Sequence, residues 1–285
     1  MKSKILWPEK KYTKADLLNY YEKIAKVLLP YLKDRPVALN RYPEGIEGIH
    51  FFQKNLGNQK IPGFVKTVTI RAASTGKNVR YAVCQNKQTL LYLADLGSIE
   101  MHPFAARVQK LDKPDYLIFD IDPGTRSTFD DLIKVAQTYH AILDSKGIPN
   151  VCKTSGKRGL HVYAPLGAKY TYEKVRAFAL EVSQEVNRQL LDITTLEQRI
   201  NKRKGRVYLD YTRNSKGQTV VCAYSLRPTP DATVSTPLLW SEVKKGLDPK
   251  KFTIKTIFKR LEKKGDLWKL VLQKGGTLPK TYARA

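Results

Sequence analysis

The feature that most constrains the fold is a short apolar segment that carries two aspartates, YLIFDID at residues 116–122. Side chains of a β-strand alternate between its two faces, so Asp120 and Asp122 share one face and the apolar side chains between them lie on the other. The Pro-Gly pair that follows ends the strand and leaves both carboxylates at its carboxyl end, where open α/β sheets usually bind ligands. The segment therefore predicts a core strand with a polar site at its end.

Two carboxylates this close repel each other unless a cation neutralises them, and strand residues two apart can hold metal ions about 3.5–4 Å from one another. The alternative is that both acids cap a loop, which is common for Asp before Pro-Gly. Burying Asp120 inside an apolar strand without a partner would be costly, which argues for the cation. Asp210, in the alternating segment VYLDYT at 207–212, is the candidate third ligand.

A second polar segment, KTSGKRGLH at residues 153–161, lies between two β-prone runs. Its glycines let backbone N–H groups approach an anion, its cations supply charge, and its histidine can donate to a phosphate oxygen. It lacks the first glycine and the Lys-Ser/Thr ending of a Walker motif. The segment predicts a phosphate-binding turn, with a plain basic hairpin as the alternative when it is taken alone.

Arg227 precedes Pro228 and follows TVVCAYS, a run that we expect to be a strand. A guanidinium at this position can clamp a triphosphate through two parallel hydrogen bonds. A lone arginine before proline is more often surface decoration. Arg227 is therefore a candidate only in company with the aspartates and the polar turn.

The spacing of apolar residues predicts an α+β, or mixed α/β, fold in two parts. Thr13, with Asp16 three residues later, has the signature of a helix cap. Between residues 36 and 107 the runs VKTVTIRAA, VRYAVCQ and TLLYLADLG indicate an antiparallel β-meander. Later strands alternate with helices, and a basic tail can fold back on the core. The expected helices lie at 13–32, 127–145, 172–191 and 254–263.

The charge balance predicts a polyanionic partner, because 51 Lys and Arg residues against 26 Asp and Glu residues give a formal net charge of +25. The three cysteines, Cys84, Cys152 and Cys222, are widely spaced among apolar residues, which favours reduced core thiols over disulfides or a zinc site. No apolar run approaches the roughly 20 residues that a membrane-spanning helix needs. We expect a cytoplasmic protein that binds nucleic acid and no membrane.

Three segments in this order, IFDIDPG, KTSGKRGLHVYAPL and LDYTRNSKGQTVVCAYSLRPTPDATVSTPL, resemble the polymerase domain of bacterial ligase D. That family belongs to the archaeo-eukaryotic primase superfamily and works in non-homologous end joining. The likeness extends to RYPEGIEGIHFFQKN and GSIEMHPFAARV, so it covers most of the chain. It implies one primase-polymerase domain over residues 1–285, with an N-terminal helix and β-rich lobe at 1–110. A primase-type catalytic lobe on an RRM-like sheet, with the basic tail, would occupy 111–285.

The resemblance also implies roles for individual residues. The three aspartates would be the metal triad for two Mn²⁺ or Mg²⁺ ions. Phe51 and Phe52 resemble an aromatic pair that stacks on template bases, and adjacent strand residues point to opposite faces, so both are hard to bury in one core. The family often has a glutamine where Arg213 stands. The implied contacts to the nucleoside triphosphate are Ser155, Lys157, Arg158, His161 and Arg227, and the remaining implied DNA contacts are His102 near the template and Lys14 and Arg41 near a downstream 5′-phosphate.

The implied function is nucleotide addition, with ribonucleotides preferred, to the 3′ end of primed, gapped or broken DNA. The implied partners are DNA, the Ku end-binding protein and a separate ligase, because the Lys-x-Asp-Gly ligase motif is absent; the implied place is the nucleoid. A haloacid-dehalogenase phosphatase is one rival, although Pro123 interrupts its Asp-x-Asp-Gly-Thr pattern. A non-catalytic nucleic-acid binder is the other. Neither rival accounts for both Asp210 and the 155–161 segment.

Overall fold

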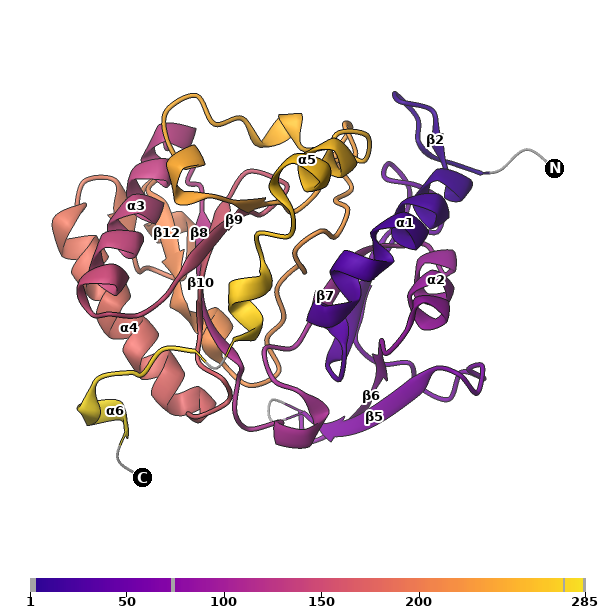
Figure 1. Cartoon of the computed structure of the whole chain (residues 1–285), viewed down its shortest axis with the longest axis horizontal. Coiled ribbons are helices and arrows are strands. Elements are labelled where there is room, and N and C mark those ends of the chain that lie inside the picture. Colours follow the sequence, from indigo (N-terminus) through magenta and orange to yellow (C-terminus); the bar gives the residue numbers. More distant parts are fainter. Residues whose placement is uncertain (1–3, 73–74, 274, 284–285) are drawn as a thin grey trace.

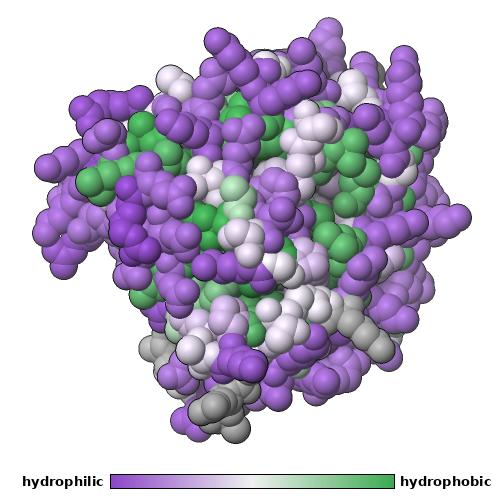
Figure 2. Space-filling view, turned by 60° about the vertical axis from the view of Figure 1, so that its left-hand side comes forward, coloured by the Kyte–Doolittle hydropathy of each residue, from purple (hydrophilic) through white to green (hydrophobic). Residues whose placement is uncertain are grey.

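Two β-sheets organise the part of the chain that the computed structural model describes, residues 4–72, 75–273 and 275–283. A five-stranded sheet lies in the N-terminal lobe, drawn in indigo and purple in Figure 1, and a six-stranded sheet lies in the second lobe. The class is mixed α/β, as predicted from the sequence. Hydrophilic side chains dominate the face shown in Figure 2, in keeping with the large net charge.

The first lobe begins with a two-stranded hairpin, β1 (Ile5–Trp7) and β2 (Tyr12–Thr13), and with helix α1 (Lys14–Leu32). The Thr13 hydroxyl accepts the Asp16 N–H, and the Asp16 carboxylate accepts the Thr13 N–H at 2.7 Å. This reciprocal cap satisfies two backbone donors at the helix start. It confirms the helix predicted at 13–32.

The five-stranded sheet of the first lobe is centred on one strand and is not a simple meander. The strand β3 pairs with β4 and β6 along one edge and with β7 along the other, while β5 pairs with β6. All these pairs are antiparallel. The strands are β3 (Pro36–Arg41), β4 (Phe51–Gln53), β5 (Lys66–Arg71), β6 (Asn78–Val83) and β7 (Ser98–Pro103).

One β-prone run of the first lobe was predicted wrongly. The residues TLLYLADLG belong to helix α2 (Lys87–Asp95) and the turn after it, not to a strand. Asn86 caps this helix, its side chain accepting the Thr89 N–H at 2.8 Å. Leu90, Leu93 and Ala94 are buried at a spacing of three and four residues, which is the helical period. The cap and this spacing outweigh the β preference of the individual residues.

The second lobe carries helices on one face of its sheet and the first lobe on the other (Figure 1). Leu117, Phe119 and Ile121 pack among the helices, whereas Tyr116 and Ile118 belong to the core shared with the first lobe. The spatial order of strands is β11-β12-β8-β10-β9-β13, antiparallel except for β11 and β12. These elements are β8 (Tyr116–Asp122), α3 (Phe129–Ser145), β9 (Val151–Thr154), β10 (Leu160–Pro165), α4 (Tyr172–Gln189), β11 (Thr194–Thr195), β12 (Val207–Asp210) and β13 (Pro237–Leu238).

The run TVVCAYS at 219–225 is also corrected, because it forms no strand. Its backbone bonds change partner along the run: the Cys222 N–H donates to Met101 at 2.9 Å and the Tyr224 N–H to Ser235 at 2.7 Å. Tyr224 has a φ of 65°, outside the range of an extended strand. The run is apolar because it is a buried connection between the lobes, and Arg227 follows this connection.

The basic tail folds back on the core. Helix α5 (Ile257–Lys264) lies within three residues of its predicted place, and Trp268 and Val271 beyond it are buried. Cys84, Cys152 and Cys222 are buried core residues. None of the helices in the described ranges is long and apolar enough to cross a bilayer. The short remaining helices are η1 (Val108–Lys110), η2 (Ile200–Lys202), η3 (Tyr211–Asn214), η4 (Trp240–Glu242), η5 (Pro249–Lys251), η6 (Lys269–Leu272) and α6 (Lys280–Ala283).

Candidate active site

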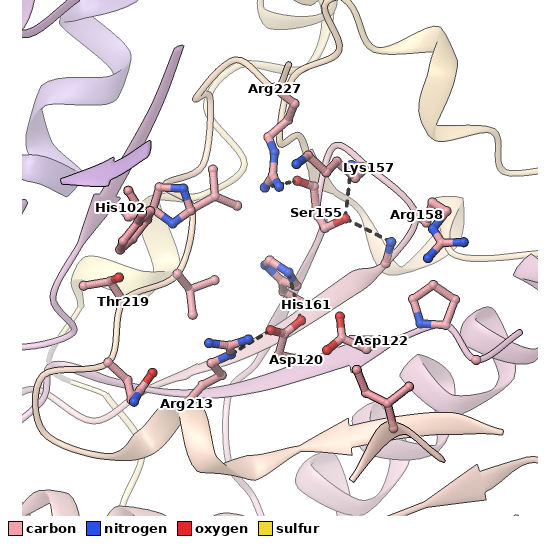
Figure 3. A pocket seen from close by; sticks show the side chains of 18 of the residues that line it. His102, Asp120, Asp122, Ser155, Lys157, Arg158, His161, Arg213, Thr219 and Arg227 are labelled. Atoms are coloured by element: carbon pink, nitrogen blue, oxygen red, sulfur yellow. Dashed lines mark hydrogen bonds and ion pairs between the residues drawn. The ribbon is translucent and has the colours of Figure 1, made fainter. Parts of the chain in front are cut away.

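A cavity of about 670 Å³ lies at the ends of β8 and β10 and draws its walls from both lobes (Figure 3). The second lobe contributes acidic residues and the turn between β9 and β10. The first lobe contributes Phe52 and His102. A space of this size is in the usual range for ligand sites, and its walls carry charge of both signs.

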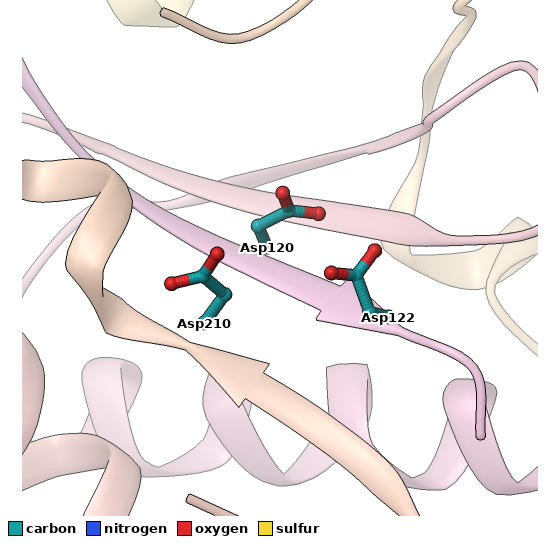
Figure 4. A group of neighbouring side chains, drawn as sticks. All are labelled: Asp120, Asp122 and Asp210. Atoms are coloured by element: carbon teal, nitrogen blue, oxygen red, sulfur yellow. The ribbon is translucent and has the colours of Figure 1, made fainter. Parts of the chain in front are cut away.

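Sheet register brings the three aspartates together at one corner of this cavity, where Asp120 and Asp122 line the wall and Asp210 lies beside Asp120 without lining it. Asp210 of β12 is paired directly with Asp120 of β8, and Asp122 follows two residues later on the same face. One carboxylate oxygen from each lies within 4.8 Å of the other two (Figure 4). Asp120 and Asp210 are buried, 7% and 6% exposed. The strand alternation read from the sequence thus produces a compact acidic cluster.

The acidic cluster is electrostatically strained without a cation. Burial, together with the negative charge of Asp120, raises the pKa of Asp122 to about 7. Burial also works to raise the pKa of Asp120, but His161 and Arg213 overcome it and hold that pKa well below its usual value. Carboxylates that compete in this way are typical of a site that holds a divalent ion.

His161 of β10 lies directly across the sheet from Asp120. Its Nε2 is 3.1 Å from an Asp120 oxygen, and its Nδ1 is 2.8 Å from the Lys153 amine. Burial and the nearby Lys153 charge lower the pKa of His161 to about 4, so its imidazole is neutral at physiological pH. The ring is therefore oriented from both sides at the edge of the acidic cluster.

The turn between β9 and β10 is folded around the Ser155 hydroxyl, which accepts the N–H groups of Lys157 and Gly159 at 3.1 and 2.9 Å. Gly156 has a φ of 76°, and a Cβ there would lie 2.6 Å from the Arg227 side chain. Arg227 Nη1 in turn donates to the Ser155 carbonyl at 2.8 Å. The turn and Arg227 thus pack as one unit. The five predicted triphosphate contacts, Ser155, Lys157, Arg158, His161 and Arg227, all line the cavity.

The two aromatic residues of the first lobe have different surroundings. Phe51 and Phe52 of β4 are 42% and 45% exposed, in keeping with the expectation that both cannot enter one core. Phe52 lines the cavity and meets His102 edge-on, with 5.1 Å between the ring centroids. Phe51 instead lies against the Arg41 guanidinium at 5.0 Å and is not part of the cavity wall.

Lys14 and Arg41 lie together at the end of α2, away from the acidic cluster. The Lys14 amine is 2.8 Å from an Asp95 oxygen, and Arg41 Nε donates to the Leu96 carbonyl at 2.8 Å. Neither lines the cavity. Two cations predicted to serve one pocket therefore share one neighbourhood on the surface of the first lobe.

Comparison with known proteins decides the family. The family model for the LigD primase-polymerase domain matches residues 13–268. The chain belongs to the LigD primase-polymerase family. This membership makes it an enzyme of the nucleotidyltransferase class and sets aside both the phosphatase and the non-catalytic binder.

Relatives in the LigD primase-polymerase family are proteins longer than this chain. The bifunctional non-homologous end joining protein LigD of Bacillus subtilis is 35% identical over 264 residues, which cover 92% of this chain and 42% of that protein. The multifunctional counterpart of Pseudomonas aeruginosa is 29% identical over 259 residues, or 91% and 30%. The chain thus spans less than half the length of either. The solved polymerase domain of Mycobacterium tuberculosis ligase D in complex with DNA superposes with a TM-score of 0.87 at 26% identity, covering 96% and 97% of the two chains.

Sequence reasoning gave Arg213 and Glu100 no contact role and counted Lys153 only among the cations of the 153–161 segment, whereas the structure places contacts of all three beside the cavity. Arg213 Nε is 3.1 Å from Asp120 and 3.0 Å from Asp210, so its guanidinium neutralises two of the acids. Lys153, fully buried, contacts His161. Glu100 of β7 reaches Arg227 at 2.6 Å. Glu100 stands two residues before His102, and this strand spacing is the one sequence signal that could have placed it on the same face.

Proposed function

We propose that this chain is a DNA-end-processing polymerase that adds nucleotides to the 3′ end of primed, gapped or broken DNA by two-metal nucleotidyl transfer. The observation that carries the proposal is the acidic cluster, three carboxylates with oxygens within 4.8 Å of one another, at the edge of a cavity whose wall also carries cations. The names of the relatives, which place them in non-homologous end joining, and the DNA complex of the solved ligase D domain support the choice of substrate.

The acidic cluster fits a pair of Mn²⁺ or Mg²⁺ ions. Carboxylate oxygens are the ligands that such hard cations prefer, and the pKa of Asp122, raised by burial and by the Asp120 charge, supports a site that a cation completes. Bound cations would stabilise the attacking and leaving oxygens of the displacement. Asp120, Asp122 and Asp210 would be their ligands. Arg213, which neutralises two of the acids in this structure, would then give up those contacts.

The cavity wall beside the acids suits a nucleoside triphosphate. Five residues line this part of the cavity. They are Ser155, Lys157 and Arg158 of the β9–β10 turn, His161 of β10, and Arg227, which follows the buried connection at 219–225. Fixed cations and oriented donors stabilise the charge of a transferring phosphoryl group without reorganising during the reaction. A preference for ribonucleotides is the finer part of the proposal and rests on the family resemblance.

The first lobe would bind the DNA. Phe52 and His102 line the cavity and would meet the template strand, with Phe51 stacking farther out. Lys14, in the first turn of α1, and Arg41 would hold a downstream 5′-phosphate, since a helix N-terminus favours an anion. We further propose that residues 1–285 act as one domain, with lobes at 1–110 and 111–285. It would work at the nucleoid beside Ku and a separate ligase.

Primer extension tests this function. A labelled duplex with a short gap is incubated with the chain, one nucleotide triphosphate at a time, and either Mn²⁺ or Mg²⁺. We expect addition templated by the gap, none in EDTA, and faster addition of ribonucleotides. Gaps with a downstream 5′-phosphate should be filled about ten- to hundredfold more efficiently than gaps without it, the range for one or two charge-assisted contacts. No addition under any of these conditions would contradict the proposal.

A further inference from the structure

Glu100 is a buried carboxylate that joins the two lobes at the cavity, and the proposed mechanism gives it no part. It lies on β7 of the first lobe and is 1% exposed. One oxygen accepts a hydrogen bond from the Asn40 side chain at 2.5 Å and lies 3.3 Å from His102 Nε2. The other lies 2.6 Å from Arg227 Nε and 3.8 Å from the Lys157 amine. A single carboxylate thus touches the aromatic side of the cavity and the cationic side.

Glu100 is a permanent negative charge at this position. Burial alone would raise its pKa, but the His102 hydrogen bond and the Arg227 charge outweigh burial and lower the pKa to about 2. Burial lowers the pKa of His102, so its ring is neutral near pH 7. Buried ions persist when they are paired, and here the pairing runs between lobes.

Arg227 is held at two of its three nitrogens. Nε faces Glu100 and Nη1 donates to the Ser155 carbonyl, which leaves Nη2 for a ligand in the cavity. The Arg227 side chain is nearly buried, 8% exposed. The Arg227 Nε and the Glu100 oxygen lie close together but are not aligned as in a hydrogen bond, so their interaction is mainly an ion pair. The Ser155 hydrogen bond and the Glu100 charge together fix the guanidinium at the cavity wall.

We propose that Glu100 is a positioning residue that aims Arg227 and Lys157 at the triphosphate of the incoming nucleotide. This inference rests on the proposed function, in which those two cations bind the triphosphate. Without Glu100, Arg227 would be a nearly buried cation lacking its closest counter-charge, and it would turn toward other carboxylates. Asp120 of the acidic cluster, whose charge already acts on Arg227, is one such carboxylate.

The direction in which KM for the nucleotide changes distinguishes a positioning role of Glu100 from a purely electrostatic one. If Glu100 acted only as a negative charge, its removal would strengthen the attraction between the cavity and a triphosphate and would lower KM. If it aligns Arg227, its removal misdirects the phosphate contact and raises KM. A purely structural residue would lower stability and leave KM for the nucleotide unchanged.

The test is steady-state gap filling by Glu100→Gln, with Glu242→Gln as the matched control. Glu242 is also an acid paired with an arginine, Arg260 at 2.5 Å, but it does not line the cavity. We expect KM for the nucleotide to rise about tenfold in Glu100→Gln, with kcat changed by less than about threefold, and no change in the control. A lowered or unchanged KM in a folded Glu100→Gln variant overturns the inference.

Two further variants protect the test. In the double variant of Glu100→Gln with Arg227→Gln, the rise in KM should be smaller than the product of the two single-variant rises, because Glu100 acts mainly through Arg227; fully multiplicative rises overturn the inference. If Glu100→Gln does not fold, Asn40→Ala replaces it. That change removes a donor to Glu100 and no charge, and we expect a rise of about two- to fivefold in KM. An unchanged KM there overturns the inference.

The two proposals fail in different ways. A wild-type chain that fills gaps while the Glu100 and Asn40 variants match it overturns the role of Glu100 and leaves the proposed function intact. A wild-type chain that adds no nucleotide overturns both.

Discussion

The two sides of the cavity are built on different principles. On the second lobe, Asp120, Asp122 and Asp210 are placed by the register of adjacent strands, and two of the three are buried. On the first lobe, Phe51 and Phe52 stand nearly half exposed on a strand of three residues. A reacting centre needs groups fixed before the substrate arrives, whereas a DNA contact can be completed by the DNA itself. The predictions below test this division between fixed chemistry and adaptable contact.

The largest effects are expected where the chain is most rigid. Changing Asp120, Asp122 or Asp210 to Asn should reduce nucleotide addition on the order of 10³-fold or more, because each change removes a metal ligand. DNA affinity, measured by fluorescence anisotropy, should stay close to that of the wild type. Asp112→Asn is the control, since Asp112 is an exposed aspartate of the same lobe paired with Lys216. Substantial extension by one of the three variants would remove that residue from the triad.

A smaller loss is expected on the cationic wall. Arg227→Ala and His161→Ala should raise KM for the nucleotide about ten- to hundredfold, the range for losing a charge-assisted hydrogen bond. Lys216→Ala, which removes an exposed cation outside the cavity, serves as the control. Wild-type kinetics at limiting nucleotide in both cavity variants would show that the triphosphate binds elsewhere.

On the adaptable side, Phe52→Ala should weaken binding of the template strand about fivefold to hundredfold, because stacking on one base contributes about 1–3 kcal/mol. Phe64→Ala is the matched control, an aromatic residue of the same lobe, 36% exposed, that does not line the cavity. Affinities for gapped DNA would be compared by anisotropy. Equal losses in the two variants would mean that Phe52 makes no special contact with a base.

The smallest effect is on stability, and its sign follows from the pKa of Asp122. Burial and the Asp120 charge raise this pKa to about 7, so the folded chain keeps a proton that the unfolded chain releases near pH 4. Stability is therefore lost as pH rises from about 4 to 7. In EDTA, Asp122→Asn should have a higher Tm than the wild type at pH 8, by about 2–4 °C. The difference in Tm should shrink toward pH 4. A lower Tm for Asp122→Asn than for the wild type at pH 8 would contradict the proposed charge repulsion in the acidic cluster.

The parts that were predictable from sequence are those whose signal is local. The alternation in 116–122 gave β8 and the shared face of its acids, and the cap at Thr13 gave the start of α1. The run at 89–97 misled because its leucines suit either structure, although the cap at Asn86 was available to decide. The run at 219–225 carried no such signal. It is apolar because both lobes bury it, and that fact lies in the tertiary structure.

The candidate site divides in the same way. The cluster of three aspartates could be expected because both strands that carry them alternate apolar and polar side chains. The role of Glu100 could not, because its partner Asn40 lies 60 residues away in sequence and Arg227 belongs to the other lobe. Arg213 was recognised as a departure from the family pattern, but its contact with two acids depends on how η3 folds against β8. Long-range pairing of charges is what local patterns do not contain.

The central claim, that three aspartates hold the catalytic cations, is tested most directly by calorimetric titration of the metal-free chain with Mn²⁺. We expect saturable binding to the wild type, accompanied by proton release to the buffer near pH 7 as the metal displaces the Asp122 proton. Asp210→Asn should lose most of that binding while remaining folded. Equal Mn²⁺ affinity in the wild type and in Asp210→Asn would contradict the account.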